Sequence, residues 1–150
     1  MMGQIGAAMV GTVAFSLLFG VPRRYYPFCG LIGGAGWAVY CWASLFWSSP
    51  SASLAATIVV ILLSRLTAVA QRCPVTIFLI SGIFPLVPGA GVYWTAYYIV
   101  TDQLALAMET GYMALKVAVA IVLGIVFVFE LPQGLFRFLV GRGPGRGRAE

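Results

Sequence analysis

Long apolar stretches alternate with short polar connections along the chain, at a spacing that predicts membrane-crossing helices. No Asp, Glu, Lys or Arg occurs in residues 1–22, 25–64, 73–101 or 117–129. A helix needs roughly 20 apolar residues to cross the hydrocarbon core of a bilayer, and most of these stretches reach or exceed that length. The pattern therefore predicts an integral membrane protein with several spans.

Local breaks divide these stretches into separate crossings. Residues 25–64 are too many for one crossing, and Ser-Ser-Pro-Ser at 48–51 divides them, because proline removes a backbone donor and a serine can cap the following helix. Gly-Val-Pro-Arg-Arg at 20–24 ends the first crossing, and Glu-Leu-Pro at 130–132 ends the last. We expect an all-α bundle of about five transmembrane helices, over residues 3–19, 28–46, 52–70, 75–101 and 110–129.

The fourth expected crossing is interrupted near residues 85–91, where the sequence is Pro-Leu-Val-Pro-Gly-Ala-Gly. Its two prolines remove hydrogen bonds from a backbone that hydrocarbon cannot satisfy. One interpretation is a proline kink within a continuous helix. The other is a discontinuous helix whose second half begins near Pro88, so that free N–H groups and the positive helix end at Gly89, Ala90 and Gly91 face an anionic group. Interrupted helices build substrate sites in many transporters.

Three further residues are candidates for substrate binding. Pro85 begins the interruption, and Tyr93 follows it as a hydrogen-bond donor. Lys116 lies in the fifth expected crossing, where a charge is costly and usually faces a cavity or a partner. Two interpretations of Lys116 remain open: it snorkels toward the outer interface, or it is the counter-charge of a substrate carboxylate.

Asp102, Glu109 and Glu130 are the acids near the predicted membrane. A proton-coupled carrier must use one of them or an acid of a partner protein. The alternative for each is a solvated residue at the end of a span.

Composition excludes several other classes of function. Apolar residues make up 61% and charged residues 9% of the 150 residues, with a mean hydropathy of +0.99, and a soluble fold of this length could not bury so many apolar side chains. The sequence has no histidine, and its three cysteines lack metal-ligand spacing. We therefore expect no catalytic residues, no metal and no cofactor. The net charge of +5 follows from charges that flank spans, so we expect no nucleic-acid partner.

Basic residues mark alternate connections. Arg23 and Arg24 follow the first expected crossing, Arg72 follows the third, and four arginines follow the fifth, whereas 101–109 carries acids but no base. Cytoplasmic connections of membrane proteins are enriched in Lys and Arg. We therefore expect an outside N-terminus, a cytoplasmic C-terminus, a transmembrane domain over 1–132, and an interfacial segment with a disordered basic tail over 133–150.

The motifs at the first connection and at the interruption resemble those of a known family. Phe-Gly-Val-Pro-Arg-Arg at 19–24, the glycine-rich second crossing and Phe-Leu-Ile-Ser-Gly-Ile-Phe-Pro-Leu-Val-Pro-Gly at 78–89 are similar to the threonine/serine exporter (ThrE-like) family. The resemblance covers about 15–132 and is to the short subunit, which corresponds to the C-terminal half of the single-chain exporters.

The resemblance implies export of threonine, serine or a dicarboxylate such as succinate across a bacterial inner membrane, driven by the proton gradient. It also implies a companion membrane subunit of about five spans, equivalent to the N-terminal half of the exporter, and hence a hetero-oligomer. The alternative from another class is a structural or assembly subunit whose broken helix only packs.

Overall fold

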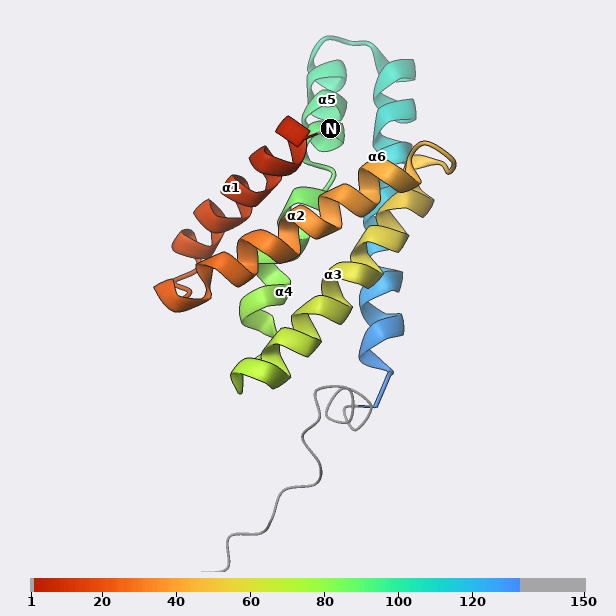
Figure 1. Cartoon of the computed structure of the whole chain (residues 1–150). Helices are drawn as coiled ribbons and strands as arrows, with labels where there is room; N and C mark the ends of the chain where they lie inside the picture. Colours follow the sequence, from red (N-terminus) through yellow and green to blue (C-terminus); the bar gives the residue numbers. More distant parts are fainter. Residues whose placement is uncertain (1, 133–150) are drawn as a thin grey trace, which may run out of the picture.

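The computed structural model describes residues 2–132, and it confirms the predicted all-α class because these residues form helices and no strand (Figure 1). The expected segment and tail at 133–150 lie outside the described residues. The helices are α1 (Met2–Leu18), the 3₁₀ turn η1 (Arg23–Tyr25), α2 (Tyr26–Ala43), α3 (Ser49–Gln71), α4 (Thr76–Ile83), the 3₁₀ turn η2 (Phe84–Leu86), α5 (Gly89–Val100) and α6 (Leu104–Phe129).

Each expected crossing is helical, but the helices differ in length. α3 and α6, with 23 and 26 residues, are each long and apolar enough to cross a membrane, and α4–η2 with α5 forms a third candidate that is bent by 49°. α1 has 17 residues and α2 has 18, so each is about 26 Å long, short of the roughly 30 Å hydrocarbon core. Length and composition thus support two or three crossings in the described residues, and crossings by α1 and α2 stay predictions.

α6 begins earlier than the expected boundary at residue 110. Asp102 adopts a left-handed conformation with φ of 56°, which turns the chain sharply at the end of α5. Gln103 then occupies the N-cap position, without a side-chain capping hydrogen bond, and the helix starts at Leu104. Glu109 therefore lies within the second turn of α6 and not in the connection before it.

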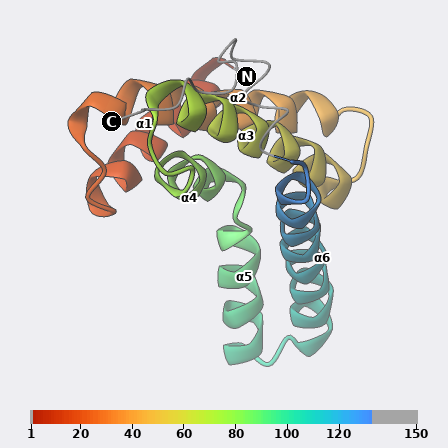
Figure 2. The ribbon, with the colours of Figure 1, turned by 90° about the horizontal axis from the view of Figure 1, so that it is seen from below.

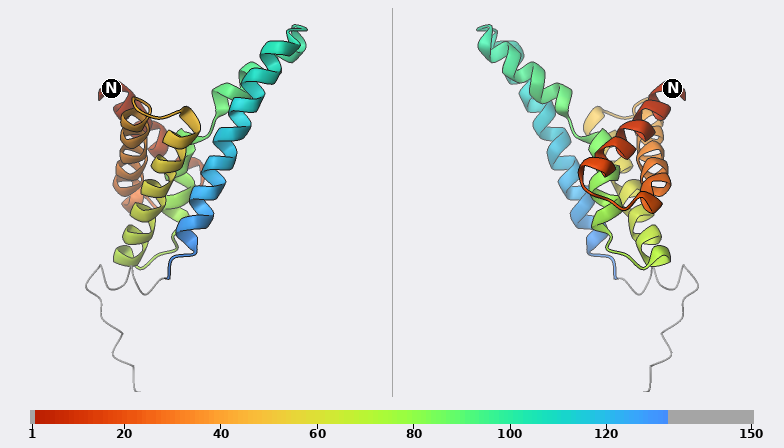
Figure 3. Two further views of the ribbon diagram at one scale, coloured as in Figure 1. Left: turned by 90° about the vertical axis from the view of Figure 1, so that its right-hand side faces the viewer. Right: turned by 90° about the vertical axis from the view of Figure 1, so that its left-hand side faces the viewer.

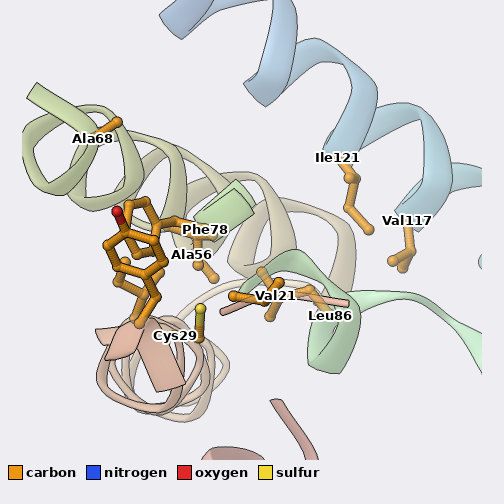
Figure 4. Close-up of a cluster of buried hydrophobic side chains, with 11 residues drawn as sticks. Val21, Cys29, Ala56, Ala68, Phe78, Leu86, Val117 and Ile121 are labelled. Atoms are coloured by element: carbon orange, nitrogen blue, oxygen red, sulfur yellow. The ribbon is translucent and has the colours of Figure 1, made fainter. Parts of the chain in front are cut away.

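The main apolar core is formed by buried residues of η1, α2, α3, α4, η2 and α6 (Figure 4). Glycines on α2 let the neighbouring helices approach closely. A Cβ added at Gly33 would lie 2.0 Å from the Oγ1 of Thr12 on α1, and one at Gly36 would lie 2.3 Å from the Cγ2 of Val60 on α3. The core is completed by Phe78 of α4, which is fully buried.

Arg65 of α3 attaches the C-terminal end of α6 to this bundle. Its side chain is buried, its guanidinium donates to the carbonyl of Val128, and it lies over the ring of Phe129. A cation at a helix C-terminus is stabilised by the carbonyls and the helix dipole there. Arg65 therefore has a structural role, because it joins α3 to the end of α6.

The connections lie at two ends of the molecule (Figure 3). One end carries the start of α1, residues 44–48 and residues 101–103. The other end carries residues 19–25, residues 72–75 and the end of α6. The connections 19–25 and 72–75, which contain the arginines at 23, 24 and 72, lie toward this second end. The expected orientation of the two termini across the membrane stays a prediction.

α5 and α6 form a hairpin that leans away from the other helices (Figure 2). α5 has no buried residue along its length. The buried residues of α6 include Ile121, Gly124 and Val128 in its C-terminal half, where it packs on α3. The hairpin is therefore attached to the bundle at one end and separates from it toward the 101–103 turn.

We expect Gly33→Ala to destabilise the protein, because the new methyl group would overlap both Oγ1 and Cβ of the buried Thr12. Overpacking of this kind costs about 1–3 kcal/mol, which a lower thermal unfolding midpoint of the detergent-solubilised protein would report. Gly11→Ala is the matched control, since nothing lies within 4 Å of the added Cβ. Equal midpoints for both variants would contradict the close α1–α2 packing.

Candidate functional site

The helix is discontinuous at Val87 and Pro88. Val87 is extended, with φ of −61° and ψ of 131°, and Pro88 has φ of −76° and ψ of 54°. α5 starts immediately afterwards and runs at 49° to α4–η2. The structure thus has two helices separated by extended residues, and the break is shorter than the expected 85–91, because Pro85 lies within η2.

The first turn of α5 leaves the N–H groups of Ala90 and Gly91 at the break without a backbone acceptor within residues 2–132. Gly89 donates its N–H to the carbonyl of Val87 at 2.7 Å, and Val92 donates to that of Pro88 at 3.0 Å. The first N–H groups of a helix have no acceptor within that helix. In the described part of the chain, no backbone carbonyl accepts from the N–H of Ala90 or Gly91.

These donors lie at a cavity of about 420 Å³ in the angle between the hairpin and the bundle. Three parts of the chain form its walls: the end of α2 with the start of α3, the break with the start of α5, and the N-terminal half of α6. The lining residues are Trp37, Tyr40, Ser49, Ser53, Leu86, Val87, Pro88, Gly89, Ala90, Gly91, Trp94, Glu109, Thr110, Met113, Ala114 and Val117.

The polar groups of the cavity differ in character from wall to wall. The N-terminus of α5 contributes partial positive charge, and Glu109 contributes a carboxylate, the one Asp, Glu, Lys or Arg side chain in the lining among the residues described. On the bundle side the hydroxyls of Tyr40 and Ser49 are hydrogen-bonded at 2.8 Å. The cavity therefore offers separate positions for an anionic and a cationic group within one mostly apolar space.

Small residues hold the cavity walls of α5 and α6 together. A Cβ at Gly91 would lie 3.0 Å from the Cβ of Ala114. Thr95 donates to the carbonyl of Gly91 at 2.7 Å and lies 3.2 Å from the hydroxyl of Thr110. The start of α5 is thus fixed against α6 by close backbone contact and by hydroxyl groups.

A family model described as "Threonine/Serine exporter, ThrE" matches residues 4–130. The chain belongs to this family. Neither the curated proteins nor the solved structures include a match to the chain. The matched residues of this exporter-family protein include all of the helices described above except the first two residues of α1, and they include both halves of the broken helix.

The structure brings part of the predicted site of this exporter-family protein together. Of the predicted residues, Pro88, Gly89, Ala90, Gly91 and Glu109 line the cavity.

The other predicted residues lie elsewhere. Pro85 lies in η2 and does not line the cavity. Tyr93 is 63% exposed and contacts Trp94, and the ammonium of Lys116 lies 4.2 Å from the ring centre of Tyr112. Asp102 is in the 101–103 turn, and Glu130 follows the last residue of α6. As substrate or coupling residues of the exporter they stay predictions without a place in the cavity.

The bundle wall of the cavity was not predicted from the sequence. Trp37 and Tyr40 are three residues apart on α2, and Ser49 and Ser53 are four apart on α3, so each pair shares a helix face. That spacing of aromatic and hydroxyl side chains within uncharged helices was the signal in the sequence that could have indicated a polar wall. It does not show that the two faces meet at the break, because this depends on how the helices pack.

We expect the cavity to admit water-soluble reagents. With Cys29, Cys41 and Cys73 replaced by alanine, a thiol at Ala90→Cys should react several-fold faster with a charged methanethiosulfonate than one at Val122→Cys. Reaction requires the thiolate, which forms in water and not in lipid; Val122 is 56% exposed on α6 outside the cavity. Equal rates in membranes would show that the cavity is closed to water.

Proposed function

We propose that this chain is one subunit of a secondary transporter that exports small amino acids, threonine and serine among them, across a bacterial inner membrane. The cavity at the helix break is its substrate site, and export is coupled to proton entry. The N-terminus lies outside and the C-terminus in the cytoplasm. The observation that carries the proposal is the cavity in which the start of α5 and the carboxylate of Glu109 both take part.

The substrate carboxylate binds at the start of α5. Ala90 and Gly91 have N–H groups that lack a backbone acceptor in the described chain, and Gly89 leaves open space beside them. Such a helix N-terminus combines aligned donors with a positive dipole end, which suits a carboxylate.

The substrate ammonium binds at Glu109. A carboxylate in the cavity favours a substrate with a positive group, and it disfavours a dicarboxylate such as succinate, whose second carboxylate would share a site with it. The aromatic rings of Trp37, Tyr40 and Trp94 in the same lining add faces on which a cation is stabilised.

Glu109 also provides a mechanism of coupling. A single carboxylate can be neutralised by a substrate ammonium or by a proton, but not by both at once. When the amino acid leaves toward the outside, Glu109 takes up a proton there and carries it inward as the site reopens to the cytoplasm. Proton entry then drives substrate exit.

A companion membrane subunit of about five spans completes the carrier. The hairpin leaves α5 without a buried residue, so this chain alone covers only part of the cavity. Rocking of the two subunits against each other would then open the site to either side, as in other carriers with a central site between two bundles.

We expect Glu109→Gln to abolish coupling. In liposomes that contain both subunits, the wild-type protein should export labelled threonine and serine faster when a pH gradient is imposed, and succinate should not be carried. Glu109→Gln should lose the response to the gradient and bind amino acids roughly tenfold to a hundredfold more weakly, since hydrogen bonds to charged groups contribute about 1.5–3 kcal/mol. Glu109→Asp, which keeps the carboxylate, should retain part of both properties.

Absence of efflux for any amino or dicarboxylic acid in the wild-type complex would favour the structural or assembly role. Succinate efflux that is unaffected by Glu109→Gln would contradict the assignment of the ammonium site. The purified wild-type complex must contain both subunits, and the Glu109→Gln complex must show the same subunit ratio, so that loss of assembly is not interpreted as loss of transport.

We expect Gly89→Leu to block transport without unfolding the protein. The position has open space around an added Cβ, and the larger side chain would occupy the cavity next to the N–H groups of Ala90 and Gly91. Efflux should fall to the background rate, while the thermal unfolding midpoint changes little. Normal efflux from a correctly assembled complex would show that substrate does not pass the break.

A further inference from the structure

Lys116 lies at the middle of the longest helix. It is the thirteenth of the 26 residues of α6 and the single lysine of the chain. At 1.5 Å per residue, it lies about 18 Å from the start of α6 and about 20 Å from its end. α6 is long and apolar enough to cross a membrane, and the hydrocarbon core is roughly 30 Å thick. A crossing centred on this helix places Lys116 at depth in the bilayer.

The charge of Lys116 has little compensation within the described residues. Its side chain is exposed, and its ammonium lies 4.2 Å from the ring centre of Tyr112, a cation–π contact that contributes about 0.5–2 kcal/mol. No ion pair joins it to a carboxylate of residues 2–132: along α6, Glu109 is about 10 Å away and Glu130 about 21 Å away. The free-energy cost of a charge in hydrocarbon exceeds the stabilisation that the contact with the Tyr112 ring provides.

The surface around Lys116 has the spacing of a helix-packing seam. Exposed side chains follow one another at alternating separations of four and three residues, which places them on one stripe of α6. We call this stripe the Lys116 seam; its members are Tyr112, Lys116, Val119, Leu123 and Val126. Such a stripe is the surface on which a second helix packs with its side chains interdigitated.

We propose that the Lys116 seam docks a transmembrane helix of a different protein, and that this helix carries an Asp or Glu at the depth of Lys116. The inference deepens the partner in the proposed function, and it rests on that proposal only for the existence of a companion subunit. The charge selects the occupant, because a carboxylate opposite Lys116 neutralises both groups within the bilayer and a purely apolar helix would leave the ammonium uncompensated.

A second copy of this chain does not fit the seam. Copies in one membrane share their orientation, so a two-fold dimer about the membrane normal would place Lys116 opposite Lys116 of the other copy. None of the acids in the described residues lies at that depth, since Asp102, Glu109 and Glu130 are all near the ends of the hairpin or of α6. The docked helix therefore comes from another protein.

A carbodiimide of low polarity tests this directly. In membranes that contain the full complex, N,N′-dicyclohexylcarbodiimide activates a carboxyl group; the lysine amine, after releasing its proton, displaces dicyclohexylurea and forms an amide. We expect a peptide that joins Lys116 to an Asp or Glu within an apolar segment of the companion subunit, identified by mass spectrometry. Because Lys116 is the single lysine, Lys116→Arg should abolish this adduct while retaining the complex, since guanidinium keeps the charge.

The other outcomes overturn the proposal. An adduct to Glu109 or Glu130 of a second copy would show that the seam is a homomeric contact. Absence of any adduct, with Lys116 instead labelled by a water-soluble amine reagent, would show that the lysine snorkels to the lipid headgroups. Efflux by a complex that gives no adduct would leave the proposed transport intact and reject only this docking surface.

Charge reversal gives an independent measurement. Lys116→Glu should remove most of the companion subunit from the co-purified complex, and replacing the crosslinked acid by lysine should restore it. Val122→Glu, which places the same charge on α6 outside the seam, is the matched control for a general effect of a carboxylate in the membrane. Equal loss in both variants without rescue would contradict a specific ion pair.

Discussion

The backbone cannot pass from α4 to α5 as one helix, and the position of the whole hairpin depends on this constraint. Pro88 has no N–H to donate, and Val87 is extended, so the ladder of helical hydrogen bonds stops there. α4 stays in the core through buried Phe78, whereas α5 departs at 49° and has no fully buried residue. The cavity exists because the chain changes direction at these two residues.

The rest of the structure attaches α5 and α6 unequally at their two ends. At one end, Arg65 donates to the carbonyl of Val128, and Gly124 leaves space for Thr57 of α3. At the other end, beyond Gly91 and its contact with Ala114, the hairpin contacts itself and not the bundle. A pair of helices that is fixed at one end is suited to hinge motion, because small rotations at the fixed end become larger displacements toward the 101–103 turn.

The sequence predicts those features that depend on local chemistry. Lipid requires long apolar helices and proline prevents their continuation, so the helices and the break at Pro88 could be located without tertiary information. The start of α6 was placed too late, because an acid at 109 was interpreted as the end of a span when the left-handed Asp102 in fact forms the turn. The wall made by Trp37 and Ser53 depends on which helix faces meet, and no pattern within one helix encodes that.

The two charges of α6 relate the cavity to the proposed docking surface, the Lys116 seam. Glu109 and Lys116 are seven residues apart, so they lie on nearly the same side of the helix, yet Glu109 lines the cavity and Lys116 does not. A helix docked along the seam would therefore pass beside the edge of the cavity at Glu109. The partner that neutralises Lys116 would also form the missing wall of the substrate site, and its movement would alter access to both.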